Sequence, residues 1–138
     1  MKFKTVFSSV IILVGAILLS FSSKAQEGTT TLDPRISEVY RDNMKLLSDV
    51  RVEALTRLLN ERVEIREEAY SRDEKYQLLS EVPLFNKYNT ALTRDEVFNI
   101  NTFNVLKYNL AFFENRDALY RVDNTNFVII IHQKAYRR

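Results

Sequence analysis

The clearest structural signal in the chain is Ala118-Leu119-Tyr120-Arg121-Val122-Asp123-Asn124-Thr125-Asn126-Phe127-Val128-Ile129-Ile130-Ile131-His132. Two runs of strand-forming residues, 118–122 and 127–132, flank four turn-forming residues, and this arrangement predicts a β-hairpin. Asn in the turn tolerates the left-handed conformation that glycine would otherwise supply. The run from Phe127 to Ile131 does not alternate with polar residues, so we expect both faces of this strand to be covered.

Upstream of this hairpin, residues 33–82 have the composition of helices. Asp33 and Pro34 are typical of a helix start, because Asp accepts hydrogen bonds from free amides and Pro suits the first helical position. Residues 35–82 contain neither Gly nor Pro, and apolar residues recur at three- and four-residue steps. This helical stripe comprises Ile36, Tyr40, Leu47, Val50, Ala54, Leu55, Leu58, Ile65, Ala69, Tyr76 and Leu79, with Arg62 and Arg72 in register.

The length of this segment leaves two arrangements open. One unbroken helix from Pro34 to Val82 would be about 70 Å long, whereas a compact domain of this size has a radius of gyration of about 13 Å. The segment therefore either folds back as a helical hairpin, with a break near Asn60 or at 71–73, or it projects and binds a partner through its stripe.

Residues 83–138 form the second half of the predicted domain and contain most of the aromatic and Asn residues. A third strand is expected over 107–113, where apolar and polar residues alternate in part. The predicted fold class is α+β, with a long N-terminal helix or helical hairpin packed on a small C-terminal antiparallel β-sheet. Residues 33–138 are expected to form a single domain.

The beginning of the chain predicts export. Lys2 and Lys4 precede an apolar run over 6–21, and Ser23 and Ala25 lie at the −3 and −1 positions of a cleavage site. These features predict a signal peptide over 1–25, followed by a disordered tail over 26–32. An uncleaved anchor is the alternative, but the run is shorter than the about 20 residues that a spanning helix needs. We therefore expect a periplasmic or secreted protein with no membrane contact after cleavage.

Removal of the leader changes the charge of the chain. The whole chain has 20 basic and 18 acidic side chains and a net charge of +2. Lys2, Lys4 and Lys24 leave with the leader, so the mature chain retains 17 basic side chains against 18 acidic ones, a net charge of −1. This balance gives no reason to expect a nucleic-acid partner or an anionic membrane.

Two short stretches suggest a source for the chain. The junction Lys24-Ala25-Gln26-Glu27 and the hairpin sequence from Tyr120 to Phe127 resemble those of small exported proteins of the Bacteroidota. Those proteins have no characterised function, so the resemblance implies export but no activity and no site.

Catalytic and metal-binding patterns are scarce. The chain has no Cys and only one His, His132, so thiol chemistry and the usual zinc ligand sets are excluded. The carboxylate pairs Glu67-Glu68 and Asp73-Glu74 would point in different directions on a helix. We expect no enzyme and no cofactor; an enzyme would require two convergent carboxylates beside His132 in a cleft.

Amide and aromatic side chains alternate in one region that could bind a ligand. The candidate residues are Asn99, Asn101, Asn104 and Tyr108, since saccharides stack on aromatic rings and amides bond to hydroxyl groups. The competing interpretation is a small aromatic core in which Asn residues make the turns. The functional hypothesis is an exported, non-enzymatic envelope protein that binds a protein partner or a second copy through the helical stripe. The alternative is a small binding module for a glycan or another envelope ligand.

Overall fold

The structure is a computed structural model that describes residues 31–71, 74 and 76–134. The predicted signal peptide over 1–25, and all but the last two residues of the predicted tail over 26–32, lie outside the described residues. Within the described part, no helix has the length and apolar character needed to cross a membrane.

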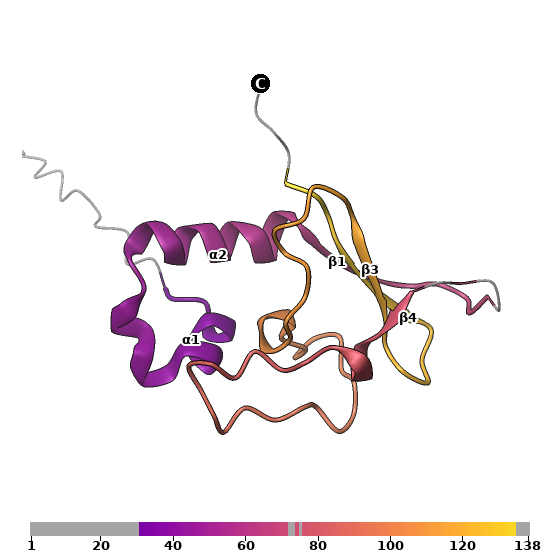
Figure 1. Cartoon of the computed structure of the whole chain (residues 1–138), viewed down its shortest axis with the longest axis horizontal. Coiled ribbons are helices and arrows are strands. Elements are labelled where there is room, and N and C mark those ends of the chain that lie inside the picture. The colour runs from indigo at the N-terminus through magenta and orange to yellow at the C-terminus, as the bar shows by residue number, and fades with distance from the viewer. Residues whose placement is uncertain (1–30, 72–73, 75, 135–138) are drawn as a thin grey trace, which may run out of the picture. The chain divides into compact units, whose positions relative to one another are not determined.

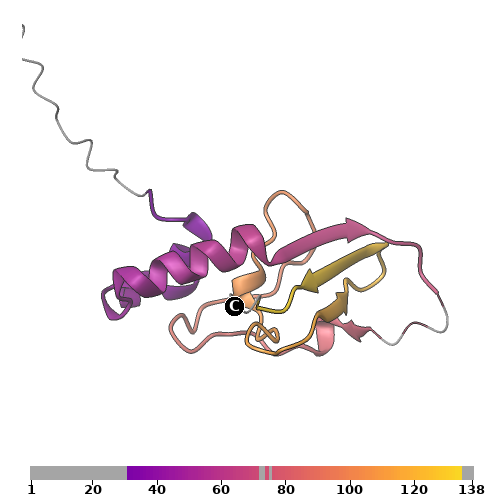
Figure 2. The same cartoon turned by 90° about the horizontal axis from the view of Figure 1, so that it is seen from above.

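The elements in chain order are α1 (Pro34–Tyr40), α2 (Asp49–Glu61), β1 (Val63–Glu67), β2 (Gln77–Leu78), β3 (Ala118–Arg121) and β4 (Phe127–Ile131), with 3₁₀ turns at Arg41–Leu46, Leu79–Glu81 and Val105–Lys107. The four strands form one mixed sheet in the order β1-β4-β3-β2. The fold class is therefore α+β, as the sequence predicts. Figures 1 and 2 show α2 leading directly into β1, with the helices toward one end of the sheet.

The two helices fold back on each other within residues 34–61. Asp33 caps α1 as predicted, since its carboxylate accepts a hydrogen bond from the amide of Arg35 at 2.9 Å. Helix α1 ends at Arg41, whose φ of 41° lies in the left-handed region. The Arg35 guanidinium lies 3.5 Å from the side-chain oxygen of Asn60, which places the start of α1 beside the end of α2.

The prediction of helix as far as Val82 is wrong beyond α2. The segment after Glu61 enters the sheet as β1, and residues 77–78 form the short strand β2. The stripe is accordingly divided between different environments: Ile36 and Leu58 are buried, whereas Val50 is 76 % exposed. It does not provide one continuous surface for a partner.

The predicted hairpin is confirmed. Strands β3 and β4 pair antiparallel, with Tyr120 opposite Ile129, and Asn124 in the turn has a φ of 56°. The sheet is nevertheless neither wholly C-terminal nor wholly antiparallel. β1 and β2 from the predicted helical half flank the hairpin, and β2 runs parallel to β3. The expected strand over 107–113 is absent from this sheet; Tyr108 makes only an isolated bridge with Leu84.

The inner face of the sheet packs on the hydrophobic core. Ile129 and Ile131 of β4 contact the buried cluster that includes Ile36 of α1 and Leu58 of α2. Aromatic side chains from the segment between β2 and β3 complete this core, for example Phe103. The core therefore draws on both halves of the chain, and none of the helices within the described residues lies over the opposite face of the sheet.

Candidate interaction surface

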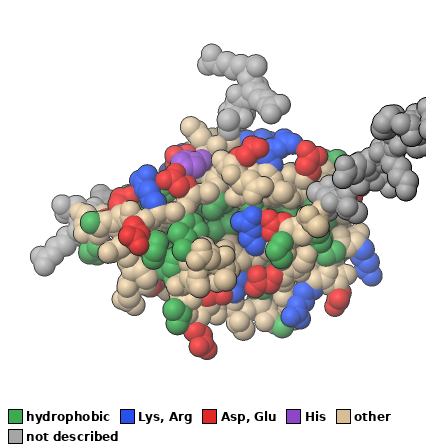
Figure 3. Space-filling model, turned by 180° about the vertical axis from the view of Figure 1, so that it is seen from behind, with side chains coloured by type: hydrophobic (Ala, Val, Ile, Leu, Met, Phe, Trp, Pro, Cys, Tyr) green, Lys and Arg blue, Asp and Glu red, His purple; other side chains and the backbone are tan. Residues whose placement is uncertain are grey.

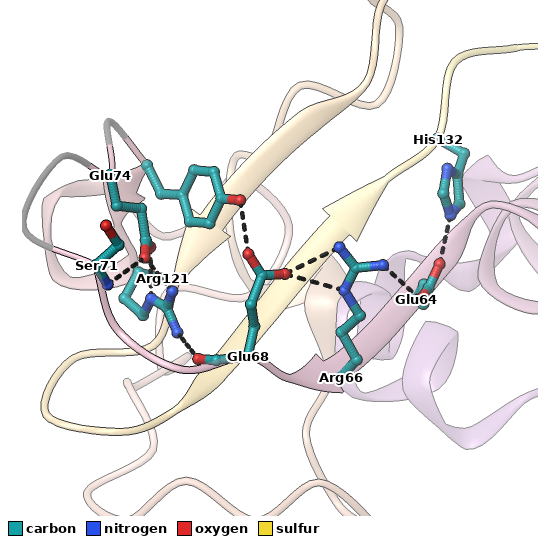
Figure 4. A network of polar contacts seen from close by, with 8 residues as sticks. Glu64, Arg66, Glu68, Ser71, Glu74, Arg121 and His132 are labelled. Carbon is teal, nitrogen blue, oxygen red and sulfur yellow. Dashed lines mark hydrogen bonds and ion pairs between the residues drawn. The ribbon is translucent and has the colours of Figure 1, made fainter.

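The outer face of the sheet is covered by charged and aromatic side chains. Successive residues of a strand point to opposite faces, so Val128 and Ile130 lie on this outer face, yet they are only 0 % and 4 % exposed. Arg66 of β1 and Arg121 of β3 lie directly opposite Val128 in the register. Their aliphatic stems can cover apolar surface while their charged ends reach polar partners. We call this layer the polar sheet face; it comprises Glu64, Arg66, Glu68, Glu74, Tyr76 and Arg121 (Figure 4).

Arg121 and Glu74 form a buried ion pair on the polar sheet face. Their side chains are only 3 % and 7 % exposed. Arg121 Nε donates to Glu74 Oε1 at 2.6 Å, and its Nη1 donates to the backbone oxygen of Glu68 at 2.7 Å. The guanidinium also lies 5.8 Å from the ring centre of Tyr70 and 5.5 Å from that of Tyr76. This pair fastens the connection between β1 and β2 to the hairpin.

A second group of contacts joins the middle of the polar sheet face. Arg66 donates to Glu68 Oε2 at 2.9 Å, and the Tyr76 hydroxyl donates to Glu68 Oε1 at 3.0 Å. The hydrogen bond from Arg66, followed by that from Tyr76, lowers the pKa of Glu68. Arg66 also lies 3.5 Å from Glu64. The acidic and basic side chains of this face therefore form ion pairs with one another.

His132 lies between two carboxylates at the edge of this network. Its Nε2 lies 2.9 Å from Glu64 Oε2, and its Nδ1 lies 3.3 Å from Asp117 Oδ2. The hydrogen bond with Glu64, assisted by Asp117, raises the pKa of His132. When the ring is protonated it can donate to both acids, and it then has no free lone pair with which to act as a general base.

Strand β1 is an edge strand with an open side. It pairs with β4 along its whole length, from Val63 opposite Ile131 to Glu67 opposite Phe127, without a bulge. No strand pairs with its other side among the residues that the structure describes. The edge contains no Pro or Gly, which are residues that commonly interrupt exposed edges. At the opposite edge of the sheet, β2 has only two residues.

A groove of about 440 Å³ runs beside the inner side of β1. Its lining includes Val63 and Ile65 of β1, residues of both helices, and the segment 100–102. We call this the β1 groove. Its lining combines partly buried apolar side chains with a few polar groups.

A second groove, of about 500 Å³, lies against α2 and is mainly apolar. Leu55 and Leu58 of the helical stripe line it, together with Phe112 and the 88 % exposed Phe113. Figure 3 shows that hydrophobic side chains do gather in a hollow on the molecular surface, surrounded by charged ones.

The four residues predicted to bind a ligand do not share one surface. Asn104 is 1 % exposed; its amide donates to the backbone oxygen of Arg35 and to Glu38, both at 2.8 Å. Tyr108 is 3 % exposed and its ring stacks on that of Phe103 at 5.4 Å. Asn99 and Asn101 are exposed, and only Asn101 lines the β1 groove.

The sequence pattern does not predict the polar sheet face, because it favours a helix over the residues that form β1. A signal for the strand was present: Val63 and Ile65 alternate with Glu64 and Arg66, a period of two. That pattern places both charged side chains on one face of a strand, whereas a helix would separate them.

The described residues offer no group of three or more His, Cys, Asp or Glu side chains that could hold a metal ion. Comparison of the chain with known protein families, with characterised proteins and with solved structures finds no match. The functional argument therefore rests on the geometry of β1, its groove and the polar sheet face.

Proposed function

We propose that the mature chain is an exported, non-enzymatic envelope protein that binds another protein chain along the open edge of β1. One observation carries this proposal: five consecutive residues, Val63 to Glu67, present an uninterrupted strand edge beside a groove. An extended chain added to such an edge gains backbone hydrogen bonds, and a neighbouring groove receives its alternate side chains. The periplasm or the exterior is the proposed location, which follows from the predicted leader.

The arrangement of His132 supports binding rather than catalysis. Both of its ring nitrogens are occupied by carboxylates, Glu64 and Asp117. The remaining acidic groups of the polar sheet face are paired with Arg66 or Arg121. No buried side-chain nitrogen or oxygen lacks a hydrogen-bond partner within the described residues. The polar sheet face therefore stabilises the strands, and the open edge of β1 is the part of the sheet proposed to bind a partner.

Photo-crosslinking in living cells tests the proposed function. A photoreactive amino acid at position 67, at the end of the open edge, should give discrete crosslinked products in the envelope fraction. The control is position 97, where Val97 is 80 % exposed on a segment far from β1 in the sequence. Products at both positions, or at neither, would contradict binding at the β1 edge. Mass spectrometry of the mature chain also tests export, since its first residue should be Gln26.

A glycan or another small envelope ligand in the β1 groove is the second candidate. Asn101 and Thr102 at the groove wall favour it, because they add polar groups beside the apolar side chains of Val63 and Ile65. Calorimetric titration with soluble peptidoglycan fragments should then show saturable binding that Asn101→Ala weakens. Binding that is absent, or unchanged by this substitution, would exclude the candidate.

A further inference from the structure

We infer that the chain which pairs with the β1 edge is a second copy of this protein, antiparallel and centred on Ile65. The inference deepens the proposed function and rests on it. Two copies would then share one continuous sheet across a twofold axis, with β1 of each copy at the junction. Backbone geometry, side-chain charge and the inner face of the strand each favour this arrangement.

The backbone geometry determines which groups are available. At the ends of the β1–β4 ladder, Glu68 N donates to Asn126 O at 2.7 Å and His132 N donates to Arg62 O at 2.8 Å. Hydrogen-bonded pairs recur at every second residue of an antiparallel ladder, so the even-numbered residues of β1 face β4. The amides and carbonyls of residues 63, 65 and 67 therefore point to the open edge.

These outward groups match a twofold axis at Ile65. Pairing Ile65 with its own copy places Val63 opposite Glu67 of the partner chain, and the reverse. The pairs 63–67 and 65–65 then join outward-facing residues, as hydrogen-bonded antiparallel pairs require, and Glu64 and Arg66 form the non-hydrogen-bonded pairs between them. The whole five-residue strand is used.

Side-chain charge favours this alignment over the alignments that are shifted by one residue. With the axis at Ile65, Glu64 of each copy lies opposite Arg66 of the other on the outer face. Moving the axis to Glu64 or to Arg66 would place two like charges directly opposite, which is unfavourable. Within one chain Arg66 already lies 3.5 Å from Glu64, so two copies bring together four charges of alternating sign.

The inner side of β1 also gains from this arrangement. Val63 and Ile65 are only partly buried in the single chain. Pairing would place Ile65 against Ile65 of the partner chain and Val63 beside the stem of the partner chain's Glu67, on the same face. A five-residue junction is nevertheless smaller than a standard interface of about 1,600 Å². We therefore expect dissociation constants in the micromolar range or weaker, so that dilution separates the copies.

Concentration-dependent hydrogen exchange of the mature protein is the direct test. At low concentration the amides of residues 63, 65 and 67 should exchange rapidly, while those of 64 and 66 stay protected by β4. At high concentration all five should be protected, and sedimentation equilibrium should show a dimer. A monomer at millimolar concentration, or protection of residues 63, 65 and 67 in the monomer, would overturn the inference.

Two sets of variants locate the interface. Glu67→Pro removes one outward amide without removing a bond to β4, and Pro is tolerated at such positions; it should weaken dimerisation at least about tenfold. Glu67→Thr, which keeps the amide, is the matched control. Arg66→Glu should weaken the dimer about tenfold, and the exchanged pair Glu64→Arg with Arg66→Glu should restore most of the loss. Circular dichroism verifies folding of each variant; dimers insensitive to all of them would refute the β1 junction.

The failure of this inference can be distinguished from failure of the proposed function. If the purified chain stays monomeric while position 67 crosslinks to a different protein in cells, the second copy is wrong and binding at the β1 edge stands. If position 67 gives no products in cells and the chain is monomeric, both are wrong. A crosslinked product with the mass of two mature chains supports both.

Discussion

The buried ion pair on the polar sheet face permits a quantitative prediction for Glu74→Ala. This substitution leaves the Arg121 guanidinium buried without a carboxylate, because the Arg121 side chain is only 3 % exposed. Two hydrogen bonds with Glu74 disappear, and the one to the backbone oxygen of Glu68 at 2.7 Å remains, together with the ring contacts. The connection between β1 and β2 loses its attachment to the hairpin at the same time.

The magnitude follows from this geometry. Removing one partner of a buried ion pair typically costs 3–5 kcal/mol, roughly, because a buried charge is left uncompensated. The remaining hydrogen bond to Glu68 and the ring contacts with Tyr70 and Tyr76 place the expected loss near the lower end of this range, at about 3 kcal/mol. Total stabilities of single domains are about 5–15 kcal/mol, and for a chain of this size the loss corresponds to a melting temperature lower by about 12 °C.

Urea unfolding followed by circular dichroism measures this loss. Glu53→Ala is the matched control, because Glu53 forms an ion pair with Arg57 in which the side chains are 70 % and 53 % exposed. That exposed pair should contribute less than about 0.5 kcal/mol. A loss below about 1 kcal/mol for Glu74→Ala, or equal losses for the two variants, would refute the role assigned to burial. Arg121→Met combined with Glu74→Leu should be less destabilising than Glu74→Ala alone, since no unpaired charge remains.

Three further predictions concern other parts of the fold. Asn104→Ala removes the buried amide that donates to the backbone oxygen of Arg35 and to Glu38 and should cost about 2 kcal/mol in urea unfolding. The exposed Asn101→Ala should cost less than about 0.5 kcal/mol, and equal losses would contradict the structural role of Asn104. Asn124 has a φ of 56°, so Asn124→Ala should lose about 1 kcal/mol while Asn124→Gly should be nearly neutral, and a reversed order of thermal stabilities would exclude the turn conformation as the cause. The raised pKa of His132 means that its ion pairs stabilise the fold fully below the unfolded His pKa of about 6.5. This advantage over His132→Gln should vanish as the pH rises through the folded pKa, and also in acid as Asp117, whose pKa is lowered, becomes protonated; an advantage that persists in alkaline solution would contradict the ion pairs.

Some elements could be predicted because the information lies within a few neighbouring residues. The hairpin needed only two strand-forming runs and an Asn-rich turn, and the start of α1 needed only Asp33 and Pro34. The apolar run of β4 also predicted burial of both its faces, which the structure confirms for Val128 and Ile129. The α+β class follows from these local signals.

The position of β1 could not be predicted in the same way. Glu64, Arg66 and Glu67 belong to residue types that favour helices, and Ile65 continues the helical spacing of the stripe. Propensity is a weak tendency that tertiary pairing overrides. The pairing partner of β1 is β4 (Phe127–Ile131). One edge of β4 pairs with β3, and its other edge pairs with β1.

The candidate site shows the same division. Amides beside aromatic rings predicted a ligand site at Asn104 and Tyr108, yet the fold uses both inside its core. The polar sheet face assembles Glu64, Glu74 and Arg121, which are far apart in the chain. No local pattern places these residues together.

The sequence by itself determined the hairpin and the cap of α1, because each depends on residue type and short spacing; the leader, and the near-neutral charge that follows its removal, stay predictions from the same kind of local pattern. Only the tertiary structure decided where the helices end, which strands flank the hairpin and which edge stays open. Those outcomes depend on contacts between distant segments: burying Ile129 and Ile131 brought β1 to the edge of the sheet. The open edge on which the proposed function rests is thus a consequence of packing. Glu64 and Arg66 lie on one face beside that edge only because the tertiary structure makes this segment a strand.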